Sequence, residues 1–254
     1  MGVLQVSSLQ IAATSDIGVK MKSTVDQIRK RFDEDVERFS NLETGQSATI
    51  DAPLVLDLIA KAAAAVCPHG TDLLDIGCGA GNYSLKLLQV LPLKEVTLID
   101  LSRPMLDRAR ERISAAASVR LNLCQSDIRD FHCDENQYDI VVAAAILHHL
   151  RGDEEWRSVF QTIYRGLKPG GSFWVSDLVH HSSPSVQAMM WSRYGEYLVT
   201  LKGENYREHV FAYIEQEDSP RPLLFQLDLL RATGFGDIEV LHKNSCFAAF
   251  GAIK

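Results

Sequence analysis

The chain has 254 residues and a mass of 28.3 kDa, which is enough for one large domain with its own hydrophobic core. Apolar residues make up 46% of the sequence and charged residues 23%, the ordinary proportions of a globular protein. The net charge of −7 argues against a general binder of nucleic acid or anionic membranes.

Cysteine usage and apolar segments indicate the compartment. The five cysteines are an odd number with no C-x-x-C pair, which disfavours a disulfide framework or a zinc knuckle. The N-terminus lacks the charged start of a secretory signal, and no apolar run approaches the roughly 18 residues of a membrane span. We therefore expect a cytoplasmic protein without a membrane partner.

Residues 1–50 are interpreted as an N-terminal extension with a lid helix. Apolar side chains recur every three or four positions between Val25 and Phe39, among many charged ones, as in a helix with one buried stripe. A second helix is expected from Asp51 to Val66, with Pro53 in its first turn. The main domain, residues 51–254, is expected to start with this second helix.

Short apolar runs then alternate with helix-like stretches. The expected strands are Leu73–Gly77, Val96–Asp100, Val119–Cys124, Asp139–Ala145 and Ser172–Leu178. The expected helices between them are Asn82–Val90, Pro104–Ala116 and Glu154–Leu167. This alternation predicts an open α/β sheet of parallel strands with helices on both faces.

The C-terminal part departs from the alternation. A helix is expected at Leu223–Thr233, followed by strands at Asp237–His242 and Cys246–Ile253. The three residues between these strands permit only an antiparallel hairpin. Before them lies an insertion, at about residues 179–221, that holds four of the seven tyrosines and is expected to form a cap over a substrate.

The segment LLDIGCGAGNYS is the strongest local signal. Gly77, Gly79 and Gly81 permit a tight turn from a strand into a helix, where free backbone N–H groups can meet a ligand. The spacing G-x-G-x-G differs from the dinucleotide pattern G-x-G-x-x-G. Asp75 just before the turn repels a pyrophosphate but can pair with an ammonium group, which favours S-adenosylmethionine (SAM).

Two further acids follow the next two expected strands. Asp100 can accept hydrogen bonds from both ribose hydroxyls. Asp127 can accept from the adenine amino group, with the Ile128 N–H on a ring nitrogen and Met105 packed against the adenine. The alternative is that each of the two acids only caps a helix.

Five stretches match one family: LLDIGCGAG, LIDLSRPML, SDIRDF, YDIVVAAAILHHL and IYRGLKPGGSFWVSD. Over about residues 51–254 the chain resembles the class I SAM-dependent methyltransferases. The resemblance implies a seven-stranded Rossmann-like sheet with an antiparallel last strand, SAM as cofactor with S-adenosylhomocysteine as product, and no metal. The implied cofactor-binding residues are Asp75, Gly77, Gly79, Gly81, Asp100, Leu101, Met105, Asp127, Ile128 and Ala143.

Within that family the chain is similar to the carboxy-SAM synthases of wobble-uridine tRNA modification. The matching stretches are FDEDVERF, IYRGLKPGG and GFGDIEVLHKNSCFAAFGAIK. Those enzymes bind the extra carboxylate with an arginine of the cap, a role that falls on Arg207. The chain departs from them at Gly79, where they carry a serine, and at the paired histidines His148 and His149.

His148 and His149 are the predicted catalytic residues, because an imidazole near the methyl group can deprotonate an acceptor. The alternative is that one packs inside and the other faces solvent. A metal site at Asp177, His180 and His181 is disfavoured, since neighbouring strand residues point to opposite faces. The predicted substrate-binding residues are Tyr194, Tyr197, Tyr206 and Arg207.

The leading hypothesis is a SAM-dependent methyltransferase that moves a methyl group to a small-molecule acceptor by in-line displacement. One alternative is a carboxy-SAM synthase-like or tRNA wobble-uridine modification enzyme, although the acidic charge disfavours direct docking of nucleic acid. Another is a non-catalytic SAM-binding interaction module. A homodimer is left open.

Overall fold

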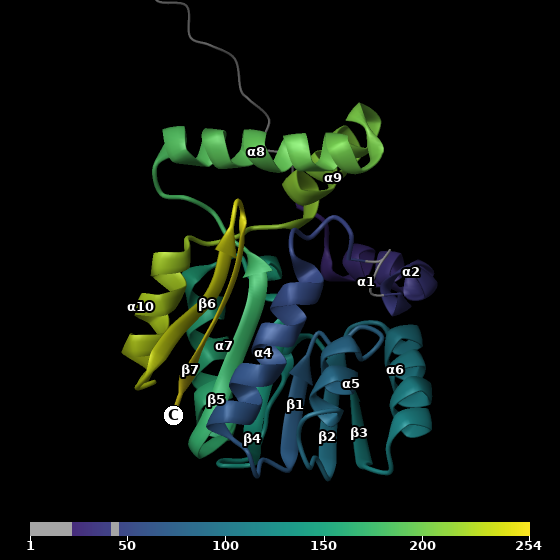
Figure 1. Ribbon diagram of the computed structural model, residues 1–254, viewed down its shortest axis with the longest axis vertical. Helices are drawn as coiled ribbons and strands as arrows, with labels where there is room; N and C mark the ends of the chain where they lie inside the picture. The colour runs from purple at the N-terminus through teal and green to yellow at the C-terminus, as the bar shows by residue number, and fades with distance from the viewer. Residues whose placement is uncertain (1–21, 42–45) are drawn as a thin grey trace, which may run out of the picture.

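Seven strands form one sheet at the centre of the protein, in the order β3-β2-β1-β4-β5-β7-β6 (Figure 1). The computed structural model describes residues 22–41 and 46–254. The strands are β1 Asp72–Ile76, β2 Glu95–Asp100, β3 Arg120–Gln125, β4 Tyr138–Ala144, β5 Leu167–Leu178, β6 Ile238–Asn244 and β7 Phe247–Ile253. Strands β1 to β5 run parallel, and β7 lies antiparallel between β5 and β6. The predicted α/β sheet with a terminal antiparallel hairpin is confirmed.

Helices cover both faces of the sheet. They are α1 Val25–Glu34, α2 Val36–Ser40, α4 Ala52–Val66, α5 Asn82–Leu88, α6 Arg103–Ala116, α7 Asp153–Gly166, α8 Pro184–Lys202, α9 Glu204–Glu217 and α10 Leu223–Thr233. Helices α4, α5 and α6 pack on one face, and α7 and α10 pack on the other. No helix in the described part is long and apolar enough to cross a bilayer. Residues 1–21 of the expected N-terminal extension lie outside the described residues.

Strand β4 shows why the central strands read as continuous apolar runs. Ile140 and Val142 point into the core beneath α4, while Val141 and Ala143 point into the core beneath α7. All four side chains are at most 1% exposed. Since both faces of the strand are buried, both sets of alternating side chains must be apolar.

Most predicted boundaries are shifted by one or two residues, and three of the differences change the local structure. The helix expected between Val25 and Phe39 is broken at Asp35, which separates α1 from α2. Strand β5 starts at Leu167 because residues before Ser172 are already extended, and Gly170 donates its N–H to the Lys254 carbonyl. Strand β6 continues to Asn244, so the hairpin turn is shorter than expected.

The expected cap insertion folds into α8 and α9, which cross above the carboxyl ends of the parallel strands (Figure 1). The two helices meet at Gly203, whose φ of 88° lies in the left-handed region. Tyr194 of α8 is 1% exposed and packs on Phe247 of β7 with a ring-centroid distance of 5.1 Å. Its hydroxyl donates to the Ala48 carbonyl at 3.0 Å. The cap is therefore anchored both to the sheet and to the segment before α4.

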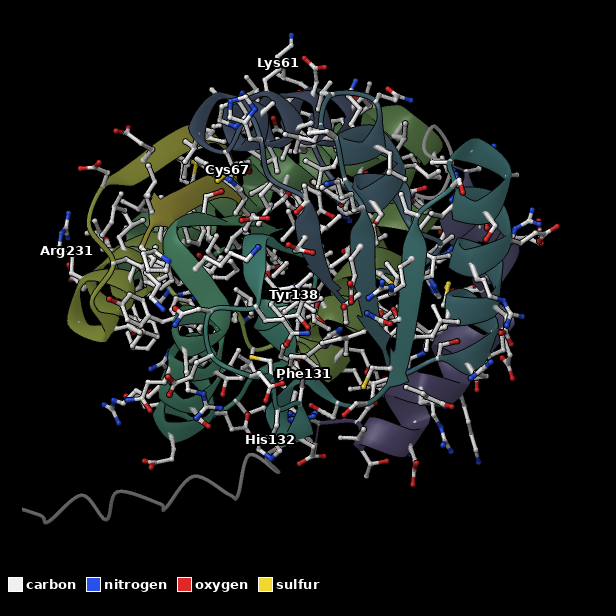
Figure 2. All side chains as sticks on the ribbon, turned by 90° about the horizontal axis from the view of Figure 1, so that it is seen from below. Lys61, Cys67, Phe131, His132, Tyr138 and Arg231 are labelled. Atoms are coloured by element: carbon white, nitrogen blue, oxygen red, sulfur yellow. The ribbon has the colours of Figure 1, made fainter. Side chains whose placement is uncertain are left out.

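At the end of the sheet opposite the cap, where the parallel strands begin, the space is filled by packed side chains. Tyr138, which starts β4, is 3% exposed and lies near the middle of this end of the molecule (Figure 2). Lys61 and Arg231 extend at the periphery of the same view. Ligands of open α/β sheets bind at the carboxyl ends of the strands. The end beneath the cap is therefore the place to look for a functional site.

A substitution at Gly251 in β7 can test how tightly side chains pack against the sheet. A Cβ atom at Gly251 would overlap the Trp174 indole and the Phe173 carbonyl oxygen. We expect Gly251→Ala to lower the free energy of unfolding by about 1–3 kcal/mol, because the indole must leave its position. Chemical denaturation measures the change. The control Gly236→Ala places its Cβ 3.6 Å from the nearest atom and should change stability little. Equal losses in both variants would contradict this packing.

Candidate active site

The glycine loop connects β1 to α5 through three residues in the left-handed region. The φ angles are 65° at Gly77, 50° at Gly79 and 79° at Gly81. A Cβ atom at Gly77 would lie 2.9 Å from Ile146, and one at Gly81 would lie 3.2 Å from Ala109. A Cβ atom at Gly79 would meet nothing within 4 Å. Neighbouring side chains therefore pack closely against Gly77 and Gly81, whereas the space beside Gly79 is open and a ligand can approach the backbone there.

Asp100 at the end of β2 holds this loop in place. Its Oδ2 atom accepts a hydrogen bond from the Gly79 N–H at 2.8 Å, and its Oδ1 atom accepts one from the Ser102 N–H at 2.8 Å. Burial raises the pKa of Asp100 to about 6. The Leu101 backbone contributes a further hydrogen bond, and because a carboxylate offers about four acceptor positions, acceptor capacity remains for a ligand.

Asp75 has a different environment from Asp100. Its carboxylate accepts from the Ser84 hydroxyl at 2.6 Å and from the Ser84 N–H at 3.2 Å. Burial raises the pKa of Asp75 to about 6. The side chain thereby fixes the first turn of α5 below the loop.

Asp127 follows β3 and caps the short 3-10 helix η1 Ile128–Asp130. It accepts from the Arg129 backbone N–H at 2.9 Å and from the Arg129 Nε at 2.8 Å. Although burial opposes ionisation, these bonds keep the pKa of Asp127 below its usual value. The capping alternative therefore applies here, and a capping role does not remove the carboxylate from the cavity wall.

A cavity of about 280 Å³ lies between the strand ends, the cap and α1. The predicted site residues in its wall are Gly77, Asp100, Leu101, Met105, Asp127, Ile128, His148, His149, Tyr194 and Tyr206. The predicted site residues outside its wall are Asp75, Gly79, Gly81, Ala143, Tyr197 and Arg207. The strand-end residues and the histidines thus share one cavity.

Two predicted substrate-binding side chains have other partners. The Arg207 guanidinium pairs with Glu204 at 2.6 Å and with Glu208 at 2.8 Å. The Tyr197 hydroxyl donates to the Ser47 carbonyl at 2.8 Å. Arg207 and Tyr197 therefore lie outside the cavity wall, although Tyr197 packs in one apolar cluster with Tyr194 and Tyr206.

His148 is held by Asp177 at the end of β5. The His148 Nδ1 atom and the Asp177 Oδ1 atom form a short hydrogen bond. The Asp177 Oδ2 atom accepts the Leu147 N–H at 2.8 Å, which fixes the 3-10 helix η2 Leu147–His149. His148 is 9% exposed and His149 is 8% exposed, so the alternative that one of them faces solvent is wrong.

Asp218, at the end of α9, completes this cluster. Its Oδ1 atom lies 3.6 Å from His148 Nε2 and 3.5 Å from His149 Nδ1. Burial raises the pKa of Asp218 to about 6. Against the opposing effect of burial, the charges of Asp177 and Asp218 raise the pKa of His148 to about 9. Burial and the neighbouring His148 lower the pKa of His149.

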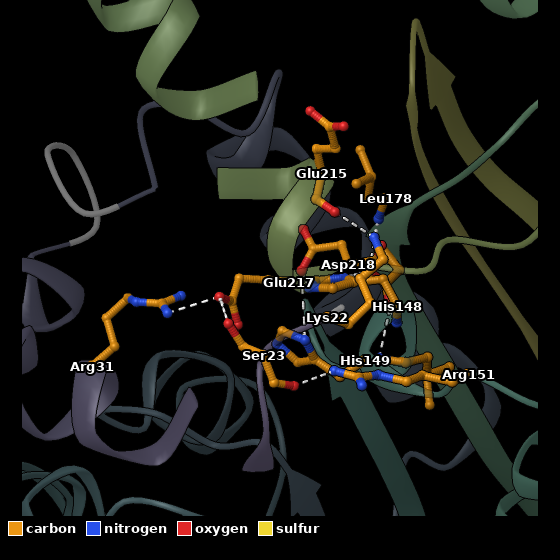
Figure 3. A network of polar contacts seen from close by, with 12 residues as sticks. Lys22, Ser23, Arg31, His148, His149, Arg151, Leu178, Glu215, Glu217 and Asp218 are labelled. Atoms are coloured by element: carbon orange, nitrogen blue, oxygen red, sulfur yellow. Dashed lines mark hydrogen bonds and ion pairs between the residues drawn. The ribbon is translucent and has the colours of Figure 1, made fainter. Parts of the chain in front are cut away.

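Sequence reasoning missed Asp218. The signal for it is the pair Glu217-Asp218 in the stretch EQEDSPR at the end of the cap. Only the path of α9 brings this pair beneath the cap, beside the end of β4 (Figure 3).

The segment before α1 is tied to the same end of α9 (Figure 3). Lys22 donates its ammonium group to the carbonyls of Glu215 and Asp218. The Ser23 hydroxyl donates to Glu217, which also accepts from Arg31 of α1 at 2.7 Å. We call this set, Lys22, Ser23, Arg31 and Glu217, the lid contact, because it joins α1 and the segment before it to the end of α9, next to Asp218 in the cavity wall.

The lid contact should control local opening of α1. Glu217 is 1% exposed, so Arg31→Ala leaves a buried carboxylate without its cation. We expect chymotrypsin to cleave at Phe32 and Phe39 about 5–30-fold faster, which corresponds to about 1–2 kcal/mol. The control Arg29→Ala removes an exposed pair with Asp26 on the same helix and should leave the rate unchanged. Equal cleavage of both variants would show that Arg31 does not hold the lid.

Comparison with known proteins indicates a methyltransferase domain. A family model described as a methyltransferase domain matches residues 73–171. A carboxy-S-adenosyl-L-methionine synthase of Trichodesmium erythraeum (strain IMS101) is 28% identical over 189 residues, which are 72% of this chain and 73% of that protein. A demethylmenaquinone methyltransferase of Listeria monocytogenes serotype 4a (strain HCC23) is 26% identical over 190 residues, which are 73% of this chain and 78% of that protein.

Solved structures share the fold at lower identity. The [4+2]-cyclase SpnF has a TM-score of 0.63 at 16% identity, covering 93% of this chain and 98% of that one. The 1,6-didemethyltoxoflavin-N1-methyltransferase of Burkholderia thailandensis, solved with S-adenosylhomocysteine, has a TM-score of 0.60 at 16% identity, covering 89% and 87%. The seven-stranded sheet, the glycine loop and these relatives support a class I SAM-dependent methyltransferase that uses SAM as its cofactor.

Proposed function

We propose that the enzyme transfers the methyl group of SAM to a small molecule enclosed between the strand ends and the cap. The observation that carries this proposal is that one cavity wall contains both Asp100, Asp127 and Met105, where we place the cofactor, and the buried histidines, where we place the acceptor. A cofactor in the first part would point its methyl group at a molecule in the second part.

The proposed cofactor position follows from the strand ends. Asp100 has acceptor capacity left for the ribose hydroxyls, and Asp127 with the Ile128 N–H suits the adenine edge. The open side of Gly79 leaves room for the amino-acid part of SAM along the loop. In this proposal Asp75 does not contact the ammonium group of SAM directly. It stabilises the first turn of α5, and this turn positions the glycine loop beside the ammonium group. The remaining predicted cofactor residues, Gly77, Gly81, Leu101 and Ala143, shape the backbone around this position.

The other part of the cavity suggests the chemical class of the acceptor. Its wall contains aromatic rings from the lid, the cap and the sheet, namely Phe32, Phe39, Tyr194, Tyr206, Tyr213 and Phe247. The polar groups of the His148 cluster lie in the same wall. An apolar wall with one polar anchor favours a flat, mostly apolar acceptor with a heteroatom near the cluster. The relative named demethylmenaquinone methyltransferase fits such an acceptor.

The proposed reaction is a displacement in line with the sulfonium. An electron pair of the acceptor forms the new bond to the methyl carbon, and the S–CH₃ bond breaks with its electrons on sulfur, which yields S-adenosylhomocysteine. Because the methyl group is already activated, alignment and exclusion of water contribute most, about 7–11 kcal/mol for a well-positioned pair. Catalysis by His148 and His149 stays a prediction, supported by their position in the wall.

The alternatives have less support. Arg207, the candidate for binding a carboxylated cofactor, pairs with two glutamates and lies outside the cavity wall. The position of the cavity beneath the cap favours a small acceptor over a tRNA. A non-catalytic SAM-binding module leaves the buried histidine cluster in the wall without a role.

Mass spectrometry of the co-purified ligand and a transfer assay test the proposal. With SAM that carries a deuterated methyl group, incubation with small-molecule extracts should yield S-adenosylhomocysteine and one product that gains the label. A bound species heavier than SAM by one CO₂ would instead support the carboxy-SAM alternative. SAM that is bound but never consumed would support a non-catalytic module.

If Asp100 binds the ribose of SAM, the affinity for SAM should depend on pH. Because its pKa is raised to about 6, protonation removes the acceptor for the ribose as the pH falls through about 6. We expect the affinity for SAM to be constant above that value and to fall below it. Asp100→Asn should weaken binding by about 1–3 kcal/mol at neutral pH and flatten the pH profile.

Isothermal titration calorimetry between about pH 5 and 8 measures this profile. The control is Asp107→Asn, which removes an exposed carboxylate on α6 and should leave affinity and profile unchanged. Unaltered affinity in Asp100→Asn would place the ribose elsewhere. A full profile that persists in that variant would assign the titration to Asp75 or Asp218, whose pKa values are also raised to about 6.

A further inference from the structure

We propose that His148, His149 and Asp218 form a binding site for a divalent metal ion, and that zinc fits it best. The three ligand atoms are His148 Nε2, His149 Nδ1 and Asp218 Oδ1, and they lie within 4.8 Å of one another. The binding site itself does not depend on the proposed function.

The two separations that involve Asp218 match a tetrahedral ion, and the two histidine nitrogens lie within 4.8 Å of each other. Asp218 Oδ1 lies 3.6 Å from His148 Nε2 and 3.5 Å from His149 Nδ1. Zinc bonds of about 2.0–2.1 Å at tetrahedral angles place neighbouring ligand atoms about 3.4 Å apart, whereas octahedral angles place them about 3.0 Å apart. Two imidazoles and one carboxylate are also a ligand set that zinc uses in proteins.

Two of the three ligand atoms are buried without a hydrogen bond. Neither His149 Nδ1 nor Asp218 Oδ1 has a hydrogen-bond partner. The two residues are 8% and 5% exposed, so solvent does not replace the missing partners. Such atoms cost free energy unless something satisfies them. A cation between the two would satisfy both at once.

The neighbours of the cluster orient its ligands. The bond from His148 Nδ1 to Asp177 leaves the Nε2 lone pair of His148 free to face Asp218. Asp177 is itself fixed by the N–H groups of Leu147 and Leu178. His149 makes a hydrogen bond with the backbone of Glu217. A histidine ligand whose second nitrogen is held by a carboxylate or backbone group is typical of metal sites.

The two carboxylates of the cluster favour a cation, whereas the positive charges of Lys22, Arg129 and Arg151 oppose one. Glu217 is neutralised by Arg31, and Lys22 donates to backbone carbonyls. Asp177 and Asp218 therefore face the two imidazoles without a lysine or arginine partner among their hydrogen bonds and ion pairs. A proton on His148 is the competing occupant, and a divalent ion that displaces it supplies one more positive charge.

The fourth position of the ion would face the cavity, because His148, His149 and Asp218 all line it. If the proposed function holds, an oxygen or nitrogen of the acceptor takes this position and is thereby oriented toward the methyl group.

Metal titration of the purified protein tests the site. After removal of any affinity tag and dialysis against a chelator, ZnCl₂ alone is titrated by calorimetry, and bound zinc is counted by mass spectrometry. We expect one zinc per chain. Asp218→Asn and His149→Gln should each weaken binding at least about tenfold, as should Asp177→Asn through His148. The control His209→Ala removes an exposed imidazole from the same cavity wall and should retain one zinc.

Cobalt provides a second readout that needs no variant. Co²⁺ in the wild-type protein should give the intense visible absorption of tetrahedral coordination. A wild-type protein that binds SAM but takes up neither ion overturns the metal site and leaves methyl transfer standing. Zinc affinity that is equal in the wild type and all three cluster variants also overturns the site. Specific zinc binding without any methyl transfer supports the site and overturns the proposed function.

Discussion

The carboxylate of Asp177 is the constraint on which the site depends. At the end of β5 it accepts hydrogen bonds from the backbone of Leu147, His148 and Leu178 and from the His148 ring. These bonds join the ends of two neighbouring strands and set the orientation of one imidazole. The position of His148 Nε2, and with it the distance to Asp218, therefore follows from the geometry of the sheet.

The fold could largely be predicted from the sequence because local patterns carry it. Strands buried on both faces need continuous apolar runs, and the short link after β6 leaves only an antiparallel hairpin. The break at Asp35 could not be predicted, because the apolar stripe continues through it to Phe39. Where the helix ends depends there on packing against the rest of the protein.

In the candidate site as well, some residue positions could be predicted from the sequence and others could not. Asp100 and Asp127 follow directly from strands, so their approach to one another is fixed by the parallel sheet. Asp218 and Arg207 lie in the cap, where no strand sets the position. Their final partners, the buried histidines for Asp218 and two surface glutamates for Arg207, depend on the path of α9. Sequence patterns therefore predict where strand-end residues lie better than which partners the residues of the cap acquire.

The lid contact and the histidine cluster occupy consecutive residues of one helix end. Glu217 holds α1, and Asp218 faces His148 and His149. Unwinding the last turn of α9 would release both at once, because the two carboxylates cannot move independently. If a product leaves the cavity by this unwinding, its release would also separate Asp218 from His148 and His149. This cluster would then have to form again before the next acceptor is positioned.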